Sequence, residues 1–159
     1  RDIPNEVPER ALDEVREINL NMLSQNPVFL ARVHLRQVDL SKVKQLLLDF
    51  DMSVPDAGFI YTFITSMIDK ADEDEQLRTQ KARLIELADD FQFYIAVMNR
   101  NEAEVLAIID AISDQKKISS FMTLIAKARS ILEANSDALL VTEFENKILE
   151  KKDELQGGA

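Results

Sequence analysis

The stretch SVPDAGFIYTFITSMI (residues 53–68) decides the fold of this chain. It is rich in β-branched and aromatic residues, so a strand is a fair alternative to a helix. Its polar residues Thr62, Thr65 and Ser66, with Asp69 just beyond, recur at steps of three and four. That spacing lines them up on one face of a helix but scatters them over both faces of a strand. The pattern therefore predicts a helix.

The start of this stretch is also typical of a helix N-terminus. Ser53 can cap the helix, Pro55 falls in the first turn where its missing N–H is harmless, and Asp56 faces the positive end of the helix dipole. A helix that is apolar on most of its circumference is either buried or in a membrane. This apolar run is shorter than the roughly 20 residues that a bilayer requires. We therefore expect a core helix surrounded by the rest of the protein.

The composition is typical of one folded helical domain. A chain of 159 residues is long enough to bury a core, and 46% hydrophobic with 30% charged residues argues against disorder. Three glycines and four prolines are too few for the frequent turns of a β-sandwich. We expect an all-α, compact multi-helix bundle of about six to eight helices joined by short turns, with a single domain over residues 1–156 and a flexible tail at 157–159.

The charge indicates the kind of partner. With a formal net charge of −10, nucleic acid is an unfavourable partner, because phosphate binding draws on clustered Lys and Arg. We expect no membrane insertion, and either a protein partner with a basic surface or simple solubility as the reason for the charge. The chain has no cysteine, which fits several compartments, with the cytoplasm slightly favoured. Because it begins with Arg1, we expect a fragment or a processed form.

Caps and breaks predict the order of the helices. In the acidic run before residue 77 we favour a break over one continuous helix, because Asp72 and Glu75 have the spacing of a capping box. The apolar segment 91–98 is the natural packing partner of residues 53–68, so Phe63 and Phe91 are both expected to be deeply buried. The expected helices cover residues 8–24, a segment capped by Asn26, a segment capped by Asp39, residues 53–68, 77–99, a segment capped by Asn101, a segment that starts at Ser119/Ser120, and residues 137–156.

An internal similarity appears when the chain is shifted so that Asp39 falls on Asn101. Tandem helical repeats produce such a pattern, and so does the chance alignment of amphipathic helices. A genuine repeat would give two related, stacked three-helix units. The matching pairs at this separation are Asp39/Asn101, Val43/Val105, Leu46/Ile108, Phe50/Ile112, Phe59/Phe121, Phe29/Phe91 and Val33/Ile95.

The sequence predicts no catalytic, cofactor-binding or metal-binding residue. His34 is the only histidine, and a packed or half-exposed side chain is a better expectation for it than a ligand. Residues 49–60 lack the glycine and the glutamate of a calcium loop. Met and aromatic residues at helical spacing are more typical of a core than of a ligand pocket. Three carboxylate groups are interpreted as caps and solvated faces: Asp72–Glu75, Glu86/Asp89/Asp90 and Glu143/Glu145.

The function expected from these features is a non-enzymatic protein–protein interaction domain, meaning an adaptor, chaperone-like or regulatory helical bundle of a larger assembly. The missing catalytic set, the acidic composition and the narrow apolar stripes of the two terminal helices favour it, since such stripes suit helix-in-groove docking. The alternative is a ligand-binding or sensory helical bundle with an internal apolar pocket. A hydrolase is the third and weakest hypothesis.

Overall fold

The computed structural model describes residues 14, 16, 22 and 25–157. All regular structure in this part is helical, so the prediction of an all-α multi-helix bundle is confirmed. The helix expected over residues 8–24 and the last two residues, 158–159, lie outside the described part, apart from the single positions just named. The seven α-helices of this part are α2 (Pro27–Arg36), α3 (Leu40–Asp49), α4 (Val54–Lys70), α5 (Glu75–Met98), α6 (Glu102–Asp110), α7 (Gln115–Leu132) and α8 (Ala138–Gly157), with a short 3-10 helix, η1 (Glu133–Asn135), before α8.

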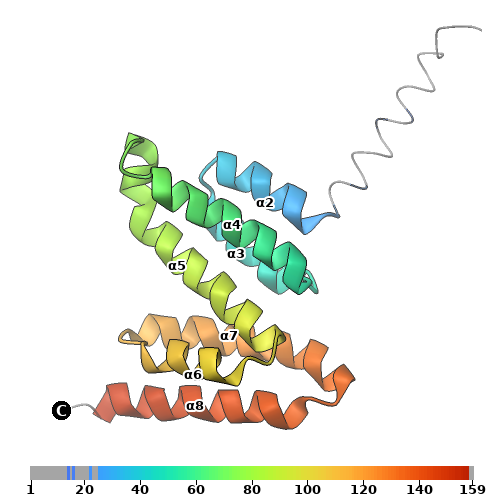
Figure 1. Ribbon diagram of the computed structural model, residues 1–159, viewed down its shortest axis with the longest axis vertical. Coiled ribbons are helices and arrows are strands. Elements are labelled where there is room, and N and C mark those ends of the chain that lie inside the picture. The colour runs from blue at the N-terminus through green and yellow to red at the C-terminus, as the bar shows by residue number, and fades with distance from the viewer. Residues whose placement is uncertain (1–13, 15, 17–21, 23–24, 158–159) are drawn as a thin grey trace, which may run out of the picture.

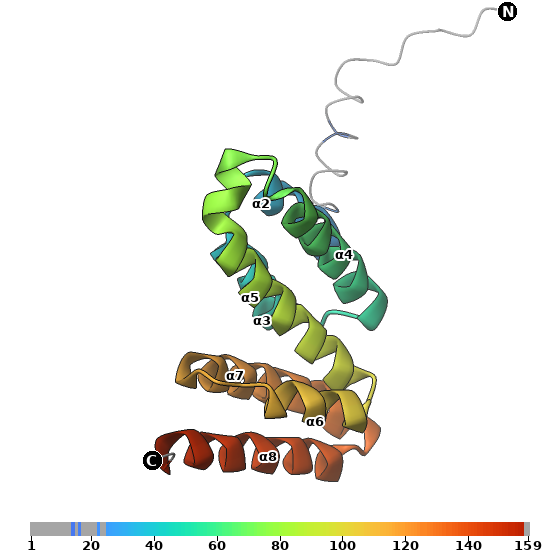
Figure 2. The same cartoon turned by 60° about the vertical axis from the view of Figure 1, so that its left-hand side comes forward.

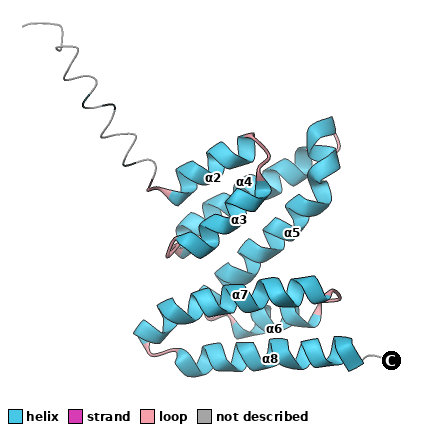
Figure 3. Cartoon of the chain, turned by 180° about the vertical axis from the view of Figure 1, so that it is seen from behind, coloured by secondary structure: helices cyan, strands magenta, loops and turns pink. Residues whose placement is uncertain are grey.

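The helices form two layers that α5 joins (Figures 1 and 2). In one layer α2, α3 and α4 lie beside the first part of α5, and in the other α6, α7 and α8 lie across its second part. With 24 residues, α5 is long enough to run from one layer into the other. Helix α7 packs against α5 and α3 on one side and against α8 on the other (Figure 3).

One apolar core runs through both layers. The burial of α5 increases along its length. Phe93 of α5 stacks on Phe121 of α7, with ring centroids 4.1 Å apart and planes inclined by 7°. The hydroxyl of Tyr94 donates to the carbonyl oxygen of Met52, just before α4, at 2.6 Å. Segment 91–98 therefore packs against α7 as well as beside the start of α4, and is not the exclusive partner of α4.

Helix α4 is less enclosed than we expected. Its buried face consists of Ala57, Ile60 and Ile64, whereas Phe59 is 59% exposed and Phe63 is half-buried. The expectation of a core helix surrounded on all sides is wrong. Within the described part α2 and α5 cover α4, and no further helix packs extensively on its other side.

Three helix ends share one turn geometry, which explains how so few glycines suffice. Val38, Arg100 and Ser136 adopt left-handed φ values of 54°, 57° and 66°. In each case the following residue donates its N–H to the carbonyl oxygen five positions before it, as in a Schellman motif. This turn ends one helix and sets the N-cap region of the next within two residues.

Most of the predicted N-caps are confirmed. The side chains of Asn26, Ser53 and Asn101 accept hydrogen bonds from backbone N–H groups in the first turns of α2, α4 and α6. Asp39 holds the N-cap position of α3 without a side-chain cap bond. The predicted break between α4 and α5 is also confirmed.

Two predicted helix starts are wrong. Asp74, not Asp72, caps α5, because its carboxylate directly precedes the first turn, while Asp72 lies farther back and pairs with Lys81 at 3.3 Å. Helix α7 starts at Gln115 with Asp114 as its cap rather than at Ser119/Ser120. Ser and Thr tolerate helix interiors where their hydroxyls find partners, so the two serines lie within the helix.

The order of the elements repeats along the chain. Helices α2, α3 and α4, which we call unit 1, are followed in the same order by the end of α5 (residues 89–98), α6 and α7, which we call unit 2. The left-handed residues Val38 and Arg100 directly precede the N-cap residues Asp39 and Asn101. The number of residues from Val38 to Arg100 is therefore the same as from Asp39 to Asn101, and we call this separation the long spacing. The buried residues Val43 and Val105 also show the long spacing.

In the third helix of each unit the separation is one residue shorter, because α6 has nine residues where α3 has ten. The caps Ser53 and Asp114 show this separation, which we call the short spacing. The predicted pair Phe59/Phe121 is therefore wrong, since one residue rotates a position by about 100° around a helix. The buried residues that correspond at the short spacing are Ala57/Ile118, Ile60/Phe121, Ile64/Ile125 and Ala71/Leu132.

Candidate functional site

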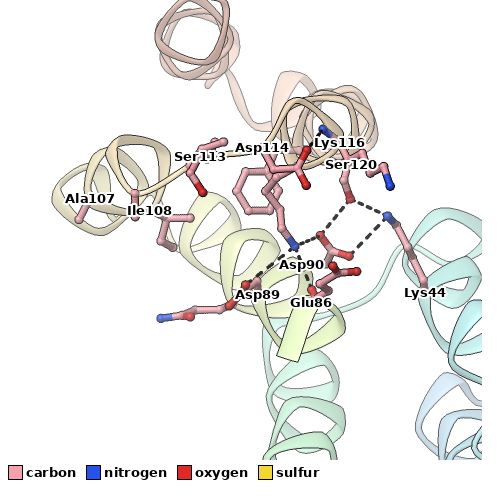
Figure 4. A pocket seen from close by; sticks show the side chains of 15 residues that line it. Lys44, Glu86, Asp89, Asp90, Ala107, Ile108, Ser113, Asp114, Lys116 and Ser120 are labelled. Atoms are coloured by element: carbon pink, nitrogen blue, oxygen red, sulfur yellow. Dashed lines mark hydrogen bonds and ion pairs between the residues drawn. The ribbon is translucent and has the colours of Figure 1, made fainter. Parts of the chain in front are cut away.

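One hollow in the surface lies where α3, α5, α6 and α7 meet, and has a volume of about 550 Å³ (Figure 4). Asp90 of α5 lies in it, and with 3% exposure is the one buried charged residue of the described part. Its carboxylate accepts a hydrogen bond from Ser120 Oγ at 2.9 Å and lies 3.4 Å from Lys44 Nζ and 3.7 Å from Lys117 Nζ. We call these four residues the Asp90 cluster.

The charges of the Asp90 cluster compensate one another. A carboxylate that loses its hydration requires charged or hydrogen-bonding partners, and two ammonium groups and a hydroxyl supply them here. Lys117 also donates to the carbonyl oxygen of Glu86 at 3.2 Å and lies over the ring of Phe121, 5.5 Å from its centroid. Burial raises the pKa of the neighbouring Asp89, while the charge of Lys117 acts in the opposite direction.

The Asp90 cluster is better suited to joining helices than to catalysis. The hydroxyl of Ser120 accepts a hydrogen bond from Lys44, so a serine and a lysine do lie side by side. A nucleophilic serine, however, requires a base that can take its proton. Here the ammonium of Lys44 is paired with the Asp90 carboxylate, and the hydroxyl donates to that same carboxylate. The cluster joins α3 to α5 and α7.

The sequence interpretation missed Asp90. We expected Glu86, Asp89 and Asp90 to lie on a solvated face, and for Asp90 this is wrong. A signal was present in the spacing, because Asp90 follows Leu87 by three residues and precedes Tyr94 by four. Both neighbours belong to the buried stripe of α5, and a residue between them at this spacing shares their face.

The second hollow, which we call the arginine groove, has a volume of about 370 Å³ and lies between α2, α4 and the start of α5. Arg32 and Arg36 of α2 line it one helical turn apart. The guanidinium of Arg32 lies over the ring of Phe63, 5.2 Å from its centroid. Phe63 and Met67 of α4 and Leu77 of α5, all half-buried, add apolar walls. The remaining lining residues are Leu35, Val38, Ser66, Asp74 and Gln76.

The two arginines of the groove form no ion pair with any residue in the described part of the chain. Asp74 is the one carboxylate in the lining, and it accepts the N–H groups of Gln76 and Leu77 at 2.9 and 3.3 Å as the cap of α5. Among the other arginines of the described part, Arg100 pairs with Asp137 at 2.7 Å and Arg129 with Glu145 at 3.1 Å, whereas Arg78 and Arg83 donate hydrogen bonds to uncharged oxygens.

Beside the groove, α4 presents a second apolar face, which we call the α4 stripe. It consists of Phe59, Phe63 and Met67, each one helical turn after the last. Phe59 is exposed, and the other two reach the groove wall. At the short spacing the corresponding positions in α7 are half-buried or buried: Ser120, Leu124 and Ala128.

The other residues that the sequence singled out do not gather into a site. His34 is half-buried, and its Nδ1 has no hydrogen-bond partner. Asp51, from the segment tested as a calcium loop, pairs with Lys127 at 2.8 Å. Within the described residues no cluster of His, Asp and Glu side chains could hold a metal ion, and no helix is long and apolar enough to cross a membrane.

The chain shows no match to known proteins in three comparisons. No protein-family model matches it, no curated protein matches it, and no solved structure matches it. Functional conclusions therefore rest on the geometry of the Asp90 cluster, the arginine groove and the α4 stripe.

Proposed function

We propose that this chain is a non-enzymatic protein–protein interaction domain, an adaptor or regulatory helical bundle that docks a partner on α4. The α4 stripe carries the proposal. Phe59, Phe63 and Met67 follow one another at one-turn spacing on the face of α4 next to the one that fills the core. A partly exposed apolar stripe of this kind suits helix-in-groove docking, and partly exposed aromatic side chains are common anchors of binding energy.

The comparison with unit 2 supports this proposal. There, Leu124 and Ala128 of α7 hold the positions of the stripe and are buried, and Ser120 bonds to side chains of α3 and α5. Neighbouring helices thus cover this face in unit 2, while in unit 1 the described part of the chain leaves Phe59 exposed and Phe63 and Met67 half-buried. A partner helix on α4 would supply the missing cover. The net charge of −10 favours basic residues on the partner around this apolar contact.

The test compares Phe59→Ser with Leu139→Ser in the full chain. Leu139 is 84% exposed on α8, in the other layer, so its substitution removes an exposed apolar side chain away from the stripe. A partner captured by the wild type is purified, its stoichiometry is measured by light scattering, and its affinity is measured by calorimetry. Phe59→Ser should weaken binding by about 30-fold, as expected for an anchor residue, and Leu139→Ser by about twofold at most.

Two results would contradict the proposal. One is equal affinity of both variants for the purified partner, and the other is a monomer that retrieves no stoichiometric partner. The alternative, a sensory bundle with an internal apolar pocket, has less support, because charged side chains line both hollows. A thermal-shift screen against lipids and aromatic ligands separates the two, since a ligand that binds the folded state raises the melting temperature.

A further inference from the structure

Two residues that line the arginine groove have counterparts in unit 2 that bind a segment of the chain itself. Arg32 corresponds to Tyr94 at the long spacing, and Ser66 corresponds to Lys127 at the short spacing. Both counterparts bind the loop between α3 and α4, residues 50–53. The molecule therefore contains an example of what this position in a unit accommodates.

The segment bound in unit 2 places an acidic residue beside an apolar one. The carboxylate of Asp51 binds Lys127 Nζ at 2.8 Å. The next residue, Met52, is 2% exposed, and its carbonyl oxygen accepts the hydrogen bond of Tyr94. An ion pair at the rim and a buried apolar side chain thus hold the loop in place.

The arginine groove offers the same combination with more positive charge. Arg32 and Arg36 form no ion pair within the described residues, and Phe63 holds the guanidinium of Arg32 beside the apolar wall. A guanidinium binds a carboxylate through two parallel hydrogen bonds. Screening limits electrostatic effects to about 8–10 Å, so the charges that line the groove, those of Arg32, Arg36 and Asp74, count for more there than the net charge of the chain.

We propose that the arginine groove binds a segment of a partner protein in which a carboxylate lies next to an apolar side chain. The carboxylate pairs with Arg32 or Arg36, and the apolar side chain enters between Phe63, Met67 and Leu77. A hollow of about 370 Å³ takes one or two side chains rather than a whole helix. The inference rests on the proposed function and names the chemistry that the partner presents next to the α4 stripe.

The first experiment selects short random peptides on the full chain and removes those that also bind the Arg32→Gln/Arg36→Gln double variant. The remaining peptides should be enriched in Asp or Glu adjacent to an aliphatic or aromatic residue. The absence of enrichment, or enrichment of neutral or basic peptides, would overturn the proposal.

The second experiment measures fluorescence anisotropy with a selected peptide and its Asn or Gln analogue. Loss of the peptide carboxylate should weaken binding by about tenfold or more, as expected for charge-assisted hydrogen bonds. The single variant Arg36→Gln and the double variant should show the same direction of change. Arg83→Gln is the matched control: it removes one positive charge from an exposed residue of α5 outside the groove and should change affinity by about twofold at most.

Competition and self-association experiments would reveal a different occupant of the groove. The proposal is overturned if a single-stranded oligonucleotide or a peptide of residues 8–24 displaces the selected peptide more strongly than any other competitor, or if purified chain self-associates through Arg36. If Phe59→Ser abolishes binding of the captured partner but the arginine variants do not, the interaction function holds and the groove chemistry is wrong. If the arginine variants abolish binding but Phe59→Ser does not, docking on the α4 stripe is wrong and the groove chemistry holds.

Discussion

The third helices of units 1 and 2, α4 and α7, correspond to each other but have different surroundings. In unit 2, α7 lies between α3 and α5 on one side and α8 on the other, and it buries residues toward both. In unit 1, α4 buries Ala57, Ile60 and Ile64 against its neighbours and leaves Phe59 open. In stacked helical units, the contribution of a side chain to stability therefore depends on the position of its unit in the stack as well as on its place within the unit.

The largest expected difference between the units is that between Phe121 and Phe59. Phe121 is 1% exposed and stacks on Phe93, so Phe121→Ala should lower the free energy of unfolding by about 3–5 kcal/mol. Phe59→Ala, on the open face of α4, should change it by about 0.5 kcal/mol at most. Urea denaturation followed by circular dichroism measures both.

Phe63 and Phe91 refine this comparison. We expected both to be deeply buried, but Phe63 is only half-buried and so should contribute less than Phe91, which has no exposed surface. Phe91→Ala should match Phe121→Ala, and Phe63→Ala should lie between the buried residues and Phe59. Equal losses at Phe59 and Phe121 would show that the two faces are not as different as their exposure indicates.

The next effect concerns the Asp90 cluster, which joins α3 of unit 1 to α5 and α7. A Lys44→Ala/Lys117→Ala double variant leaves the Asp90 carboxylate buried without an ionic partner, which should cost about 3 kcal/mol. Removing Asp90 as well, with Asp90→Leu, should recover part of that loss, because no buried charge then remains. A triple variant less stable than the double variant would contradict the electrostatic account.

Much of the fold could be predicted from the sequence, but little of the candidate site. Caps such as Asn26 and Ser53 act within one turn, so local sequence determines them. The burial of Asp90 depends on Lys44, which lies far away in the sequence, and the open face of α4 depends on which helices pack beside it. The arginine groove likewise combines residues from three helices, and their proximity follows from packing alone.

A pH-dependent effect separates Tyr94 of unit 2 from its counterpart Arg32 in unit 1. Burial, and then the charge of Asp51, raise the pKa of Tyr94 to about 12 from its usual value of 10.0. As the pH rises, the hydroxyl of Tyr94 therefore loses its proton in the unfolded chain before it does so in the folded chain. The contribution of the protonated tyrosine to the stability of the fold is present below pH 10 and disappears as the pH rises toward 12.

Tyr94→Phe should therefore lower stability by about 1 kcal/mol at pH 7, where it removes the hydrogen bond to Met52. The wild type should lose about 2–3 kcal/mol of its free energy of unfolding at alkaline pH, which corresponds to the difference between the folded and unfolded pKa values of the tyrosine, and the variant should not show this loss. The difference in unfolding free energy between wild type and variant, measured from pH 8 to pH 12, isolates this residue from the other groups that titrate there. A constant difference over that range would contradict the raised pKa.

The smallest expected effect tests the spacing that relates the two units. At the short spacing Ser53 corresponds to Asp114, and both side chains accept a backbone N–H in the first turn of their helix. Ser53→Ala and Asp114→Ala should each cost about 1 kcal/mol. At the long spacing the counterpart of Ser53 would be Gln115, which is the first residue of α7 and not its cap, and Gln115→Ala should cost about 0.5 kcal/mol at most. If Gln115→Ala lowered the free energy of unfolding more than Asp114→Ala, the third helices would correspond at the long spacing. Phe59 would then correspond to Phe121, and the α4 stripe would no longer be equivalent to the covered face of α7.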